Sequence, residues 1–343
     1  MKTKILLSLL TLIVIFFTGL FFYVKPYYDF LTGTLKISLA KTLFTNGSLQ
    51  THNGQVNTAI LGIGGGNHDG PNLSDSIIVA SYNFQTNRLT TISIPRDIWS
   101  NTLKDKINSA YAYGGMDMAK TELSAVVGMP IQYAAIIDFS KFEELINFLG
   151  GVDVNVENSF TDHLFPIPGK ENDPCGGDPQ YSCRYETISF TKGITHMDGV
   201  TALNFVRSRH AEGEEGTDFA REKRQQLVIA AVKNKIIAMA RQHKLTQLKA
   251  LYQLVNQVVK RDITNQQAAI IGKNIILKNN FQQNSVVLTE DFFDVPDYSP
   301  TYKEMWVLIP TDKNFTIIHK YIDCYLNARQ NCESLKPTPT PTP

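Results

Sequence analysis

The arginines of this chain gather in one short region. Four of the ten arginines fall between positions 207 and 224, in Arg207-Ser208-Arg209 and Arg221-Glu222-Lys223-Arg224, and a fifth, Arg96, follows an apolar run. The guanidinium group is a rigid, planar fork of donors that matches phosphate oxygens. Because the formal net charge is only +1, the clustering is local and does not reflect a basic composition. The pattern predicts a site for a polyanion, best fitted by a pyrophosphate.

Arg221 and Gln225 lie four residues apart on a helix predicted for residues 218–242 with Asp218 as its N-cap. Stepping along the same face leads to an apolar stripe of Ile229, Val232 and Ile236, so both polar residues are predicted to face inward. An inward cation beside the positive end of a helix dipole is favourable only when an anion lies there too. The alternative is a structural ion pair, for instance with Glu186 or Asp97, and for Arg207 and Arg209 it is a solvated basic loop.

Two further segments could contribute to such a site. Asp75 precedes the apolar run Ile77–Ala80, where a carboxylate could hold a cation or cap a turn. The stretch Gly62–Gly66 could cradle phosphate with backbone N–H groups, but it lacks the residue order of known phosphate loops, and such a stretch is more often a flexible turn.

The N-terminus predicts a membrane anchor. Ile5–Val24 is a run of twenty uncharged residues, enough for a transmembrane helix, and no small-residue cleavage site follows it. A cleaved signal peptide is the alternative. We expect residues 1–4 in the cytoplasm, 5–24 in the plasma membrane as a single pass, 25–55 as a juxtamembrane segment and 56–333 as an extracytoplasmic domain.

Four cysteines agree with an oxidising compartment. Cys175 and Cys183 are eight positions apart, as are Cys324 and Cys332, so two local bridges are the simplest of the three possible connectivities. Four unpaired thiols are the alternative. A pI near 7.7 argues against nucleic-acid binding.

The pattern from residue 56 onward predicts an α/β fold. Apolar runs typical of strands occupy 58–63, 77–80, 89–94, 131–137 and 152–156, and helices are predicted at 116–127, 139–149 and 198–206. Residues 158–184 form an insertion rich in Pro, Gly, Asp and Asn, and residues 334–343 form a Pro/Thr-rich tail.

Taken in order, eight short stretches resemble the LytR–CpsA–Psr family of cell-wall proteins. Their spacing fits along residues 58–240, and they are Leu61-Gly62-Ile63, Ser74-Asp75-Ser76-Ile77-Ile78, Ser93-Ile94-Pro95-Arg96-Asp97, Lys106-Ile107-Asn108-Ser109-Ala110-Tyr111, Leu149-Gly150-Gly151-Val152-Asp153-Val154, Met197-Asp198-Gly199, Val206-Arg207-Ser208-Arg209 and Asp218-Phe219-Ala220-Arg221-Glu222-Lys223-Arg224-Gln225.

The resemblance implies a three-layer α/β/α domain with a central mixed sheet. It also implies an enzyme that moves a glycopolymer from a polyprenyl-pyrophosphate carrier to peptidoglycan as a phosphodiester. By motif match, the pyrophosphate would be held by Arg96, Arg207, Arg209, Arg221 and Gln225, and a Mg²⁺ by Asp75.

The chain departs from the family pattern at the acidic side of this site. Gly64 stands where the family usually has a second metal-side aspartate, and Leu73 stands where it usually has arginine. Asp69, in the loop between them, is a candidate substitute for the missing metal ligand. The altered acidic site keeps two other functions open, a non-catalytic binder of polyprenyl-pyrophosphate or wall polymer and a prenyl-pyrophosphate hydrolase.

Overall fold

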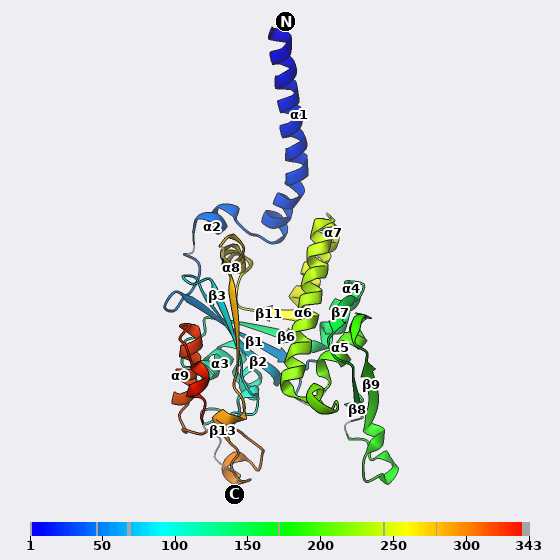
Figure 1. Cartoon of the computed structure of the whole chain (residues 1–343), viewed down its shortest axis with the longest axis vertical. Helices are drawn as coiled ribbons and strands as arrows, with labels where there is room; N and C mark the ends of the chain where they lie inside the picture. The colour runs from blue at the N-terminus through cyan, green and yellow to red at the C-terminus, as the bar shows by residue number, and fades with distance from the viewer. Residues whose placement is uncertain are drawn as a thin grey trace. The chain divides into compact units, whose positions relative to one another are not determined.

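The chain divides into two compact units, and Figure 1 labels elements of both. The computed structural model describes residues 2–45, 47–66, 70–170, 172–242, 244–278 and 280–337. The first unit comprises residues 1–139 and 259–343, and the second comprises residues 140–258. The second unit is therefore inserted into the chain of the first.

The first unit is built on a six-stranded sheet with the order β11-β6-β1-β2-β3-β12. β1 runs parallel to β6 and β12 parallel to β3, while the remaining neighbours are antiparallel. The α/β fold with a central mixed sheet is thus confirmed. The strands are β1 (Gln55–Ile63), β2 (Ser74–Asn83), β3 (Arg88–Ser93), β6 (Tyr133–Asp138), β11 (Val259–Arg261) and β12 (Gln282–Val287).

The core of the first unit lies between this sheet and two helices, α3 (Ala110–Val127) and α9 (Thr316–Leu326). Strand register aligns small and β-branched side chains in a row across the sheet, namely Ala134, Ala59, Val79, Ile92 and Val286, each at most 1% exposed. These residues pack against helix side chains such as Leu123 and Ile322. One helical layer on the sheet is therefore established, and the third layer stays a prediction.

The other described elements of the first unit surround this core. They are α1 (Lys2–Asp29), η1 (Phe30–Thr34), α2 (Leu39–Phe44), β4 (Trp99–Ser100), β5 (Asp105–Lys106), η2 (Ile107–Ser109), η3 (Phe139–Lys141, which continues into the second unit), α8 (Asn265–Leu277), η7 (Glu290–Phe292), β13 (Phe293–Asp294), η8 (Pro300–Tyr302), β14 (Ile309–Pro310) and η9 (Cys332–Leu335).

The second unit packs helices against two small antiparallel sheets, β7–β10 and β8–β9. Its buried cluster includes Val154, Phe160, Phe205 and Val228. Its elements are α4 (Phe142–Phe148), β7 (Val152–Val156), β8 (Phe160–Pro166), η4 (Cys175–Gly177), η5 (Ser182–Arg184), β9 (Tyr185–Phe190), β10 (Gly193–Met197), α5 (Gly199–Arg207), η6 (Gly213–Gly216), α6 (Asp218–Arg241) and α7 (Leu245–Val258).

Two sequence expectations need correction here. The N-cap of α6 is Thr217, whose side chain accepts a hydrogen bond from the backbone N–H of Ala220, so the helix is capped one residue earlier than expected. The insertion at 158–184 is not wholly irregular, because its first part forms β8 and pairs with β9 as a hairpin. An aspartate near the middle of β8 hides the usual strand pattern from the sequence.

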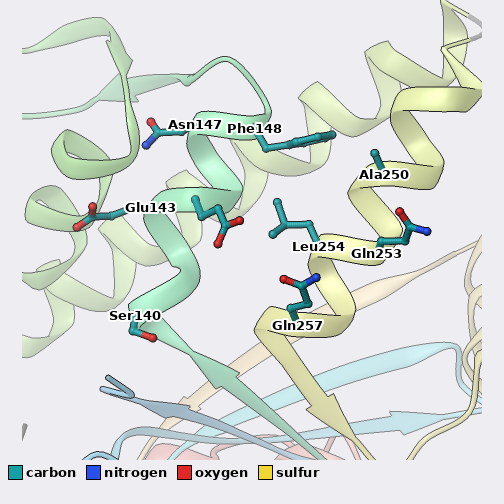
Figure 2. A pocket seen from close by; sticks show the side chains of 9 residues that line it. Ser140, Glu143, Asn147, Phe148, Ala250, Gln253, Leu254 and Gln257 are labelled. Carbon is teal, nitrogen blue, oxygen red and sulfur yellow. The ribbon is translucent and has the colours of Figure 1, made fainter. Parts of the chain in front are cut away.

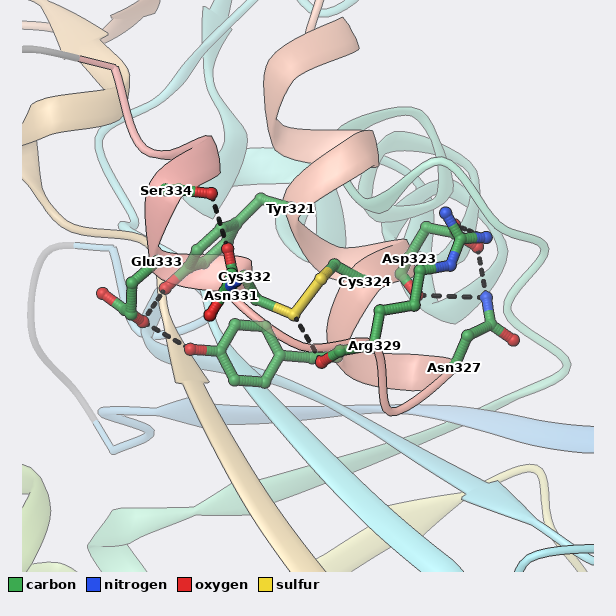
Figure 3. Close-up of a disulfide and its surroundings, with 10 residues drawn as sticks. Tyr321, Asp323, Cys324, Asn327, Arg329, Asn331, Cys332, Glu333 and Ser334 are labelled. Carbon is green, nitrogen blue, oxygen red and sulfur yellow. Dashed lines mark hydrogen bonds and ion pairs between the residues drawn. A yellow bond between two sulfur atoms is a disulfide. The ribbon is translucent and has the colours of Figure 1, made fainter.

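Both predicted disulfides are confirmed. Cys175 bonds Cys183 with a Cα–Cα distance of 5.5 Å, and Cys324 bonds Cys332 at 5.7 Å. Figure 3 shows that the second bridge ties η9 to α9, where Glu333 accepts hydrogen bonds from the hydroxyls of Tyr321 and Tyr325. The C-terminal segment is thus held by one covalent bond and by a polar cluster beside it.

The predicted transmembrane helix at residues 5–24 is not supported. Within the described part of the chain, no helix combines the length and the apolar character needed to cross a membrane. These residues belong to α1, and the side chains of residues 1–14 fall outside the described set.

Candidate functional site

Two predicted site residues of the first unit, Asp75 and Arg96, belong to an ion-pair network at the ends of two strands. Asp75 lies in β2 and accepts a short hydrogen bond from Nη1 of Arg96, which follows β3. Asp97 Oδ2 lies 3.5 Å from Nε of Arg96, and its Oδ1 accepts a 2.7 Å bond from Nζ of Lys106. The structure therefore brings Asp75 and Arg96 together and adds Asp97 and Lys106, which the sequence analysis did not assign to the site although both fall within the motif stretches.

The acidic part of this network offers few ligands for a magnesium ion. Asp75 offers one half-exposed carboxylate, already bonded to Arg96, and Asp69 lies outside the described residues. Mg²⁺ is commonly held by one or two carboxylates together with phosphate oxygens and water, so this donor set is compatible with the ion when a phosphate is present. Among the described residues, the only group of three potential metal ligands is Asp173, Cys175 and Cys183, whose sulfurs are bonded to each other.

The glycine stretch between β1 and β2 is shaped by packing. A Cβ at Gly65, where φ is +63°, would lie 1.8 Å from Oδ1 of Asp138, and a Cβ at Gly62 would lie 2.5 Å from the ring of Phe139. The backbone N–H of Gly65 donates to the carbonyl of Pro71. These glycines therefore let the loop lie against Asp138 and Phe139, and the N–H group of Gly65 is already used.

Arg207 and Arg209 mark the end of helix α5 in the second unit. Both side chains are exposed, whereas Ser208 between them is completely buried. Ser208 has φ −53° and ψ 133°, so the chain becomes extended at this residue. Alternation of exposed and buried positions follows from the extended backbone and leaves two arginines two residues apart on the surface.

A buried carboxylate lies beneath this segment. Asp162 in β8 is 0% exposed, and its Oδ2 accepts bonds from Oγ of Ser208 (2.7 Å), the N–H of Arg209 (3.2 Å) and the N–H of His210 (3.1 Å). Burial alone would raise the pKa of Asp162, but these hydrogen bonds and one from Leu164 outweigh it and hold the pKa below its ordinary value. Asp162 is therefore an ionised residue in the interior of the second unit.

The inward-facing arginine of α6 is Arg224, so the predicted face of this helix is wrong. Ile229, the first residue of the predicted stripe, is 68% exposed, whereas Val228 is 1% and Arg224 is 2% exposed. Arg221 and Gln225 are only half-buried. The buried face is rotated by about one residue from the predicted one, although Val232 and Ile236 still pack against the core cluster.

Arg224 joins three segments of the second unit. Its guanidinium group donates to the carbonyl of Phe205 at 3.0 Å and of Ser208 at 2.7 Å, which are acceptors near the end of α5. It also binds the carbonyl (2.8 Å) and carboxylate (3.0 Å) of Glu215 and lies over the ring of Phe160. Burial lowers the pKa of Arg224, and the charge of Glu215 opposes that shift. A structural ion pair of the kind expected as an alternative for Arg221 exists at Arg224.

A separate pocket of about 710 Å³ lies between α4 and α7 (Figure 2). Phe148 and Leu254 point into the space between the helices, and Ser140 and Gln257 lie at the opposite end of the pocket from Phe148 and Ala250. Its described lining residues are Ser140, Glu143, Glu144, Asn147, Phe148, Ala250, Gln253, Leu254 and Gln257, which include none of the predicted site residues. This pocket therefore contributes nothing to the arginine-based site.

Comparison with known proteins places the chain among related sequences and folds. The sequence model of the LytR_cpsA_psr family matches residues 34–304. The polyisoprenyl-teichoic acid–peptidoglycan teichoic acid transferase TagU of Bacillus cereus is 31% identical over 205 residues, which cover 59% of this chain and 58% of that protein. The chain thus matches less than two thirds of the length of that relative.

Solved structures agree with this assignment at the level of the fold. The crystal structure of B. subtilis TagV has a TM-score of 0.53 at 22% identity, covering 84% of this chain and 100% of TagV. The structure of TagT bound to LI-WTA has a TM-score of 0.51 at 22% identity, covering 83% of this chain and 93% of TagT. The shared fold therefore extends over most of the chain.

Proposed function

Because the chain belongs to the LytR–CpsA–Psr family, we propose that it is a transferase moving a glycopolymer from a polyprenyl-pyrophosphate carrier to peptidoglycan. The observation that carries the proposal is the family match over residues 34–304, together with a relative whose name describes transfer of teichoic acid to peptidoglycan. In the reaction, an acceptor hydroxyl forms a new P–O bond to the phosphate that carries the glycan. The pyrophosphate P–O bond breaks, prenyl monophosphate leaves, and the hydroxyl proton passes to that product or to solvent.

In this proposal the arginines neutralise the pyrophosphate. Arg96, Arg207, Arg209 and Arg221 bind its oxygens, and Gln225 donates a further hydrogen bond. Phosphoryl transfer needs little covalent chemistry from the protein, so positioning and charge neutralisation supply most of the catalysis. The exposure of Arg207 and Arg209 on either side of buried Ser208 supports this role, because a ligand in solvent can reach both side chains.

Asp75 is the residue we propose as the Mg²⁺ ligand, with Asp69 as its partner. When bound, Mg²⁺ would polarise the phosphate and offset its charge. Since Asp75 also pairs with Arg96, a pyrophosphate that attracts Arg96 would release carboxylate oxygen for the ion. Through this exchange, the metal and the pyrophosphate would bind cooperatively.

We place the domain outside the cytoplasm, anchored at the plasma membrane by its N-terminal segment. Two disulfides support an oxidising compartment, and the uncharged run Ile5–Val24 supports the anchor. Protease digestion of intact cells tests the placement. Protection of the domain until the membrane is permeabilised would contradict it.

A single-turnover assay with a glycan-labelled lipid carrier and peptidoglycan tests the function. Label joined to peptidoglycan identifies transfer, label on a released phosphoglycan identifies hydrolysis, and unchanged carrier that stays bound identifies a binder. The double variant Arg207→Ala/Arg209→Ala should lose transfer, whereas Arg241→Ala, an exposed arginine at the far end of α6, should retain it.

The non-catalytic binder is the second candidate, and two observations favour it. Gly64 lacks a carboxylate where the family usually has one, and Asp75 is engaged by Arg96. Transfer by the wild-type protein that is lost in Asp75→Asn would exclude the binder.

A further inference from the structure

The least expected feature of the second unit is the fully buried aspartate of β8. Burying an ionised carboxylate is costly unless hydrogen bonds replace its water. Asp162 meets this requirement mainly through one short segment, since three of its four described hydrogen bonds come from residues 208–210. A side chain of β8 thus holds the segment that follows α5 in its conformation.

The bonds fix the backbone on both sides of Arg209. The N–H of Arg209 belongs to the peptide plane before its Cα, and the N–H of His210 belongs to the plane after it. Both donate to the same oxygen of Asp162, so the two planes are held and the Cα–Cβ direction of Arg209 follows from them. The backbone bridge between Asp162 and Ala211 extends the hold by one residue.

Arg224 binds the hydrogen-bond acceptors of the same segment. It binds the carbonyls of Phe205 and Ser208, which bracket Arg207, while Asp162 binds hydroxyl and N–H groups. The buried cation Arg224 thus donates to the carbonyl groups of this segment, and the buried anion Asp162 accepts from its hydroxyl and N–H groups. Their opposite charges also favour each other's ionised forms.

We infer that Asp162 is a positioning residue, which sets the directions of Arg207 and Arg209 for binding of the pyrophosphate anion. This inference rests on the proposed function. Asp162 itself is buried and touches no substrate. Its contribution is to keep the two arginines in one arrangement before the ligand arrives, so that less conformational freedom is lost on binding.

The chain offers a graded set of variants. Asp162→Asn keeps the shape of the side chain but removes its charge. It also replaces one acceptor oxygen by an NH₂ donor, which then lies opposite another donor, either the N–H of Leu164 or the donors of residues 208–210. Ser208→Ala removes only the 2.7 Å bond and serves if Asp162→Asn does not fold. Thr161→Ala is the matched control, because Thr161 is the neighbouring residue of β8 and its hydroxyl contacts Ser189, away from the arginine segment.

The experiment measures inorganic pyrophosphate binding to the full chain by calorimetry, at a temperature where every variant is folded. We expect Asp162→Asn to bind about tenfold more weakly, Ser208→Ala several-fold more weakly and Thr161→Ala like the wild type. The amide hydrogens of Arg209 and His210 should exchange faster in Asp162→Asn, while those of α6 stay protected. A purely structural role would lower the melting temperature without changing the affinity of the folded protein.

The outcomes separate the two ideas. If the wild type binds pyrophosphate and both Asp162→Asn and Ser208→Ala bind it equally well, the positioning role is refuted and the proposed function stands. If the wild type binds no pyrophosphate and transfers no glycan, the proposed function falls and takes the inference with it.

Discussion

Replacing Arg224 by methionine should destabilise the second unit strongly. The variant keeps much of the side-chain volume but removes a guanidinium group that is 2% exposed and donates to three carbonyl groups and one carboxylate. Removing one partner of a buried ion pair costs about 3–5 kcal/mol, since the other partner stays buried without compensation.

The lower end of that range applies here. The side chain of Glu215 is 21% exposed and also accepts a 2.9 Å bond from Asn158, so its carboxylate keeps some solvation when Arg224 is lost. We therefore expect a loss of roughly 3 kcal/mol, which lowers the melting temperature by on the order of 10 °C. Arg224→Lys should recover part of the loss, because lysine keeps the charge but not the fork of donors.

The probe must report on the second unit. Both tryptophans, Trp99 and Trp306, belong to the first unit, so tryptophan fluorescence is the wrong signal. Far-UV circular dichroism and amide hydrogen exchange of α5 and α6 are suitable. Arg241→Met is the control, since Arg241 is an exposed residue of the same helix and should cost about 0.5 kcal/mol. Equal stabilities of Arg224→Met and Arg241→Met would refute the reasoning.

Four further predictions follow from other parts of the molecule. Arg221→Ala should abolish transfer and change the free energy of unfolding by only about 0.5 kcal/mol, as measured in urea, because the side chain is only half-buried; a large loss of stability would show a structural role. Asp75→Asn should weaken Mg²⁺ binding in calorimetry done with a prenyl-pyrophosphate analogue, and unchanged affinity would exclude Asp75 as a ligand. Hydrogen bonds from Lys336, Tyr325 and Tyr321 lower the pKa of Glu333 to about 2, so its contribution to stability is present at neutral pH and is lost as the pH falls from the usual glutamate range toward 2; Glu333→Gln should remove that part of the acid sensitivity in thermal melts between pH 5 and 2. The double variant Cys324→Ser/Cys332→Ser opens an eight-residue loop and should lower the free energy of unfolding by roughly 2–3 kcal/mol, with no loss in urea titrations arguing against it.

The sequence was informative where local patterns decide structure. Strands β1, β2, β3 and β6 followed from apolar runs, the mixed order of the sheet followed from the family resemblance, and both disulfides followed from the shortest pairing of four cysteines. Short-range spacing is enough to recognise these features, because the apolar pattern of a strand and the closure of a small disulfide loop both depend on residues near one another in the sequence.

Features that depend on distant partners were not predictable. The apolar run 227–232 contains six consecutive apolar residues, so it does not define a single helix face. The buried face of α6 depends on the carbonyl groups at the end of α5 and on Glu215, which are the hydrogen-bond partners of the buried Arg224. Asp162 was missed for the same reason, because an acidic residue between Thr161 and His163 resembles a loop until its partners near position 208 are known.

The insertion of residues 140–258 also imposes an order on biosynthesis. The chain leaves the first unit after β6 and returns at β11, two paired neighbouring strands, with Val259 opposite Ile137. During translation, the second unit therefore has its complete sequence before β12 and α9 of the first unit exist. At about 5–20 residues per second, the stretch from residue 139 to the end of α9 at Leu326 takes roughly 10–40 s. For that interval the apolar side chains of the first unit that pack against α9 lack their partner.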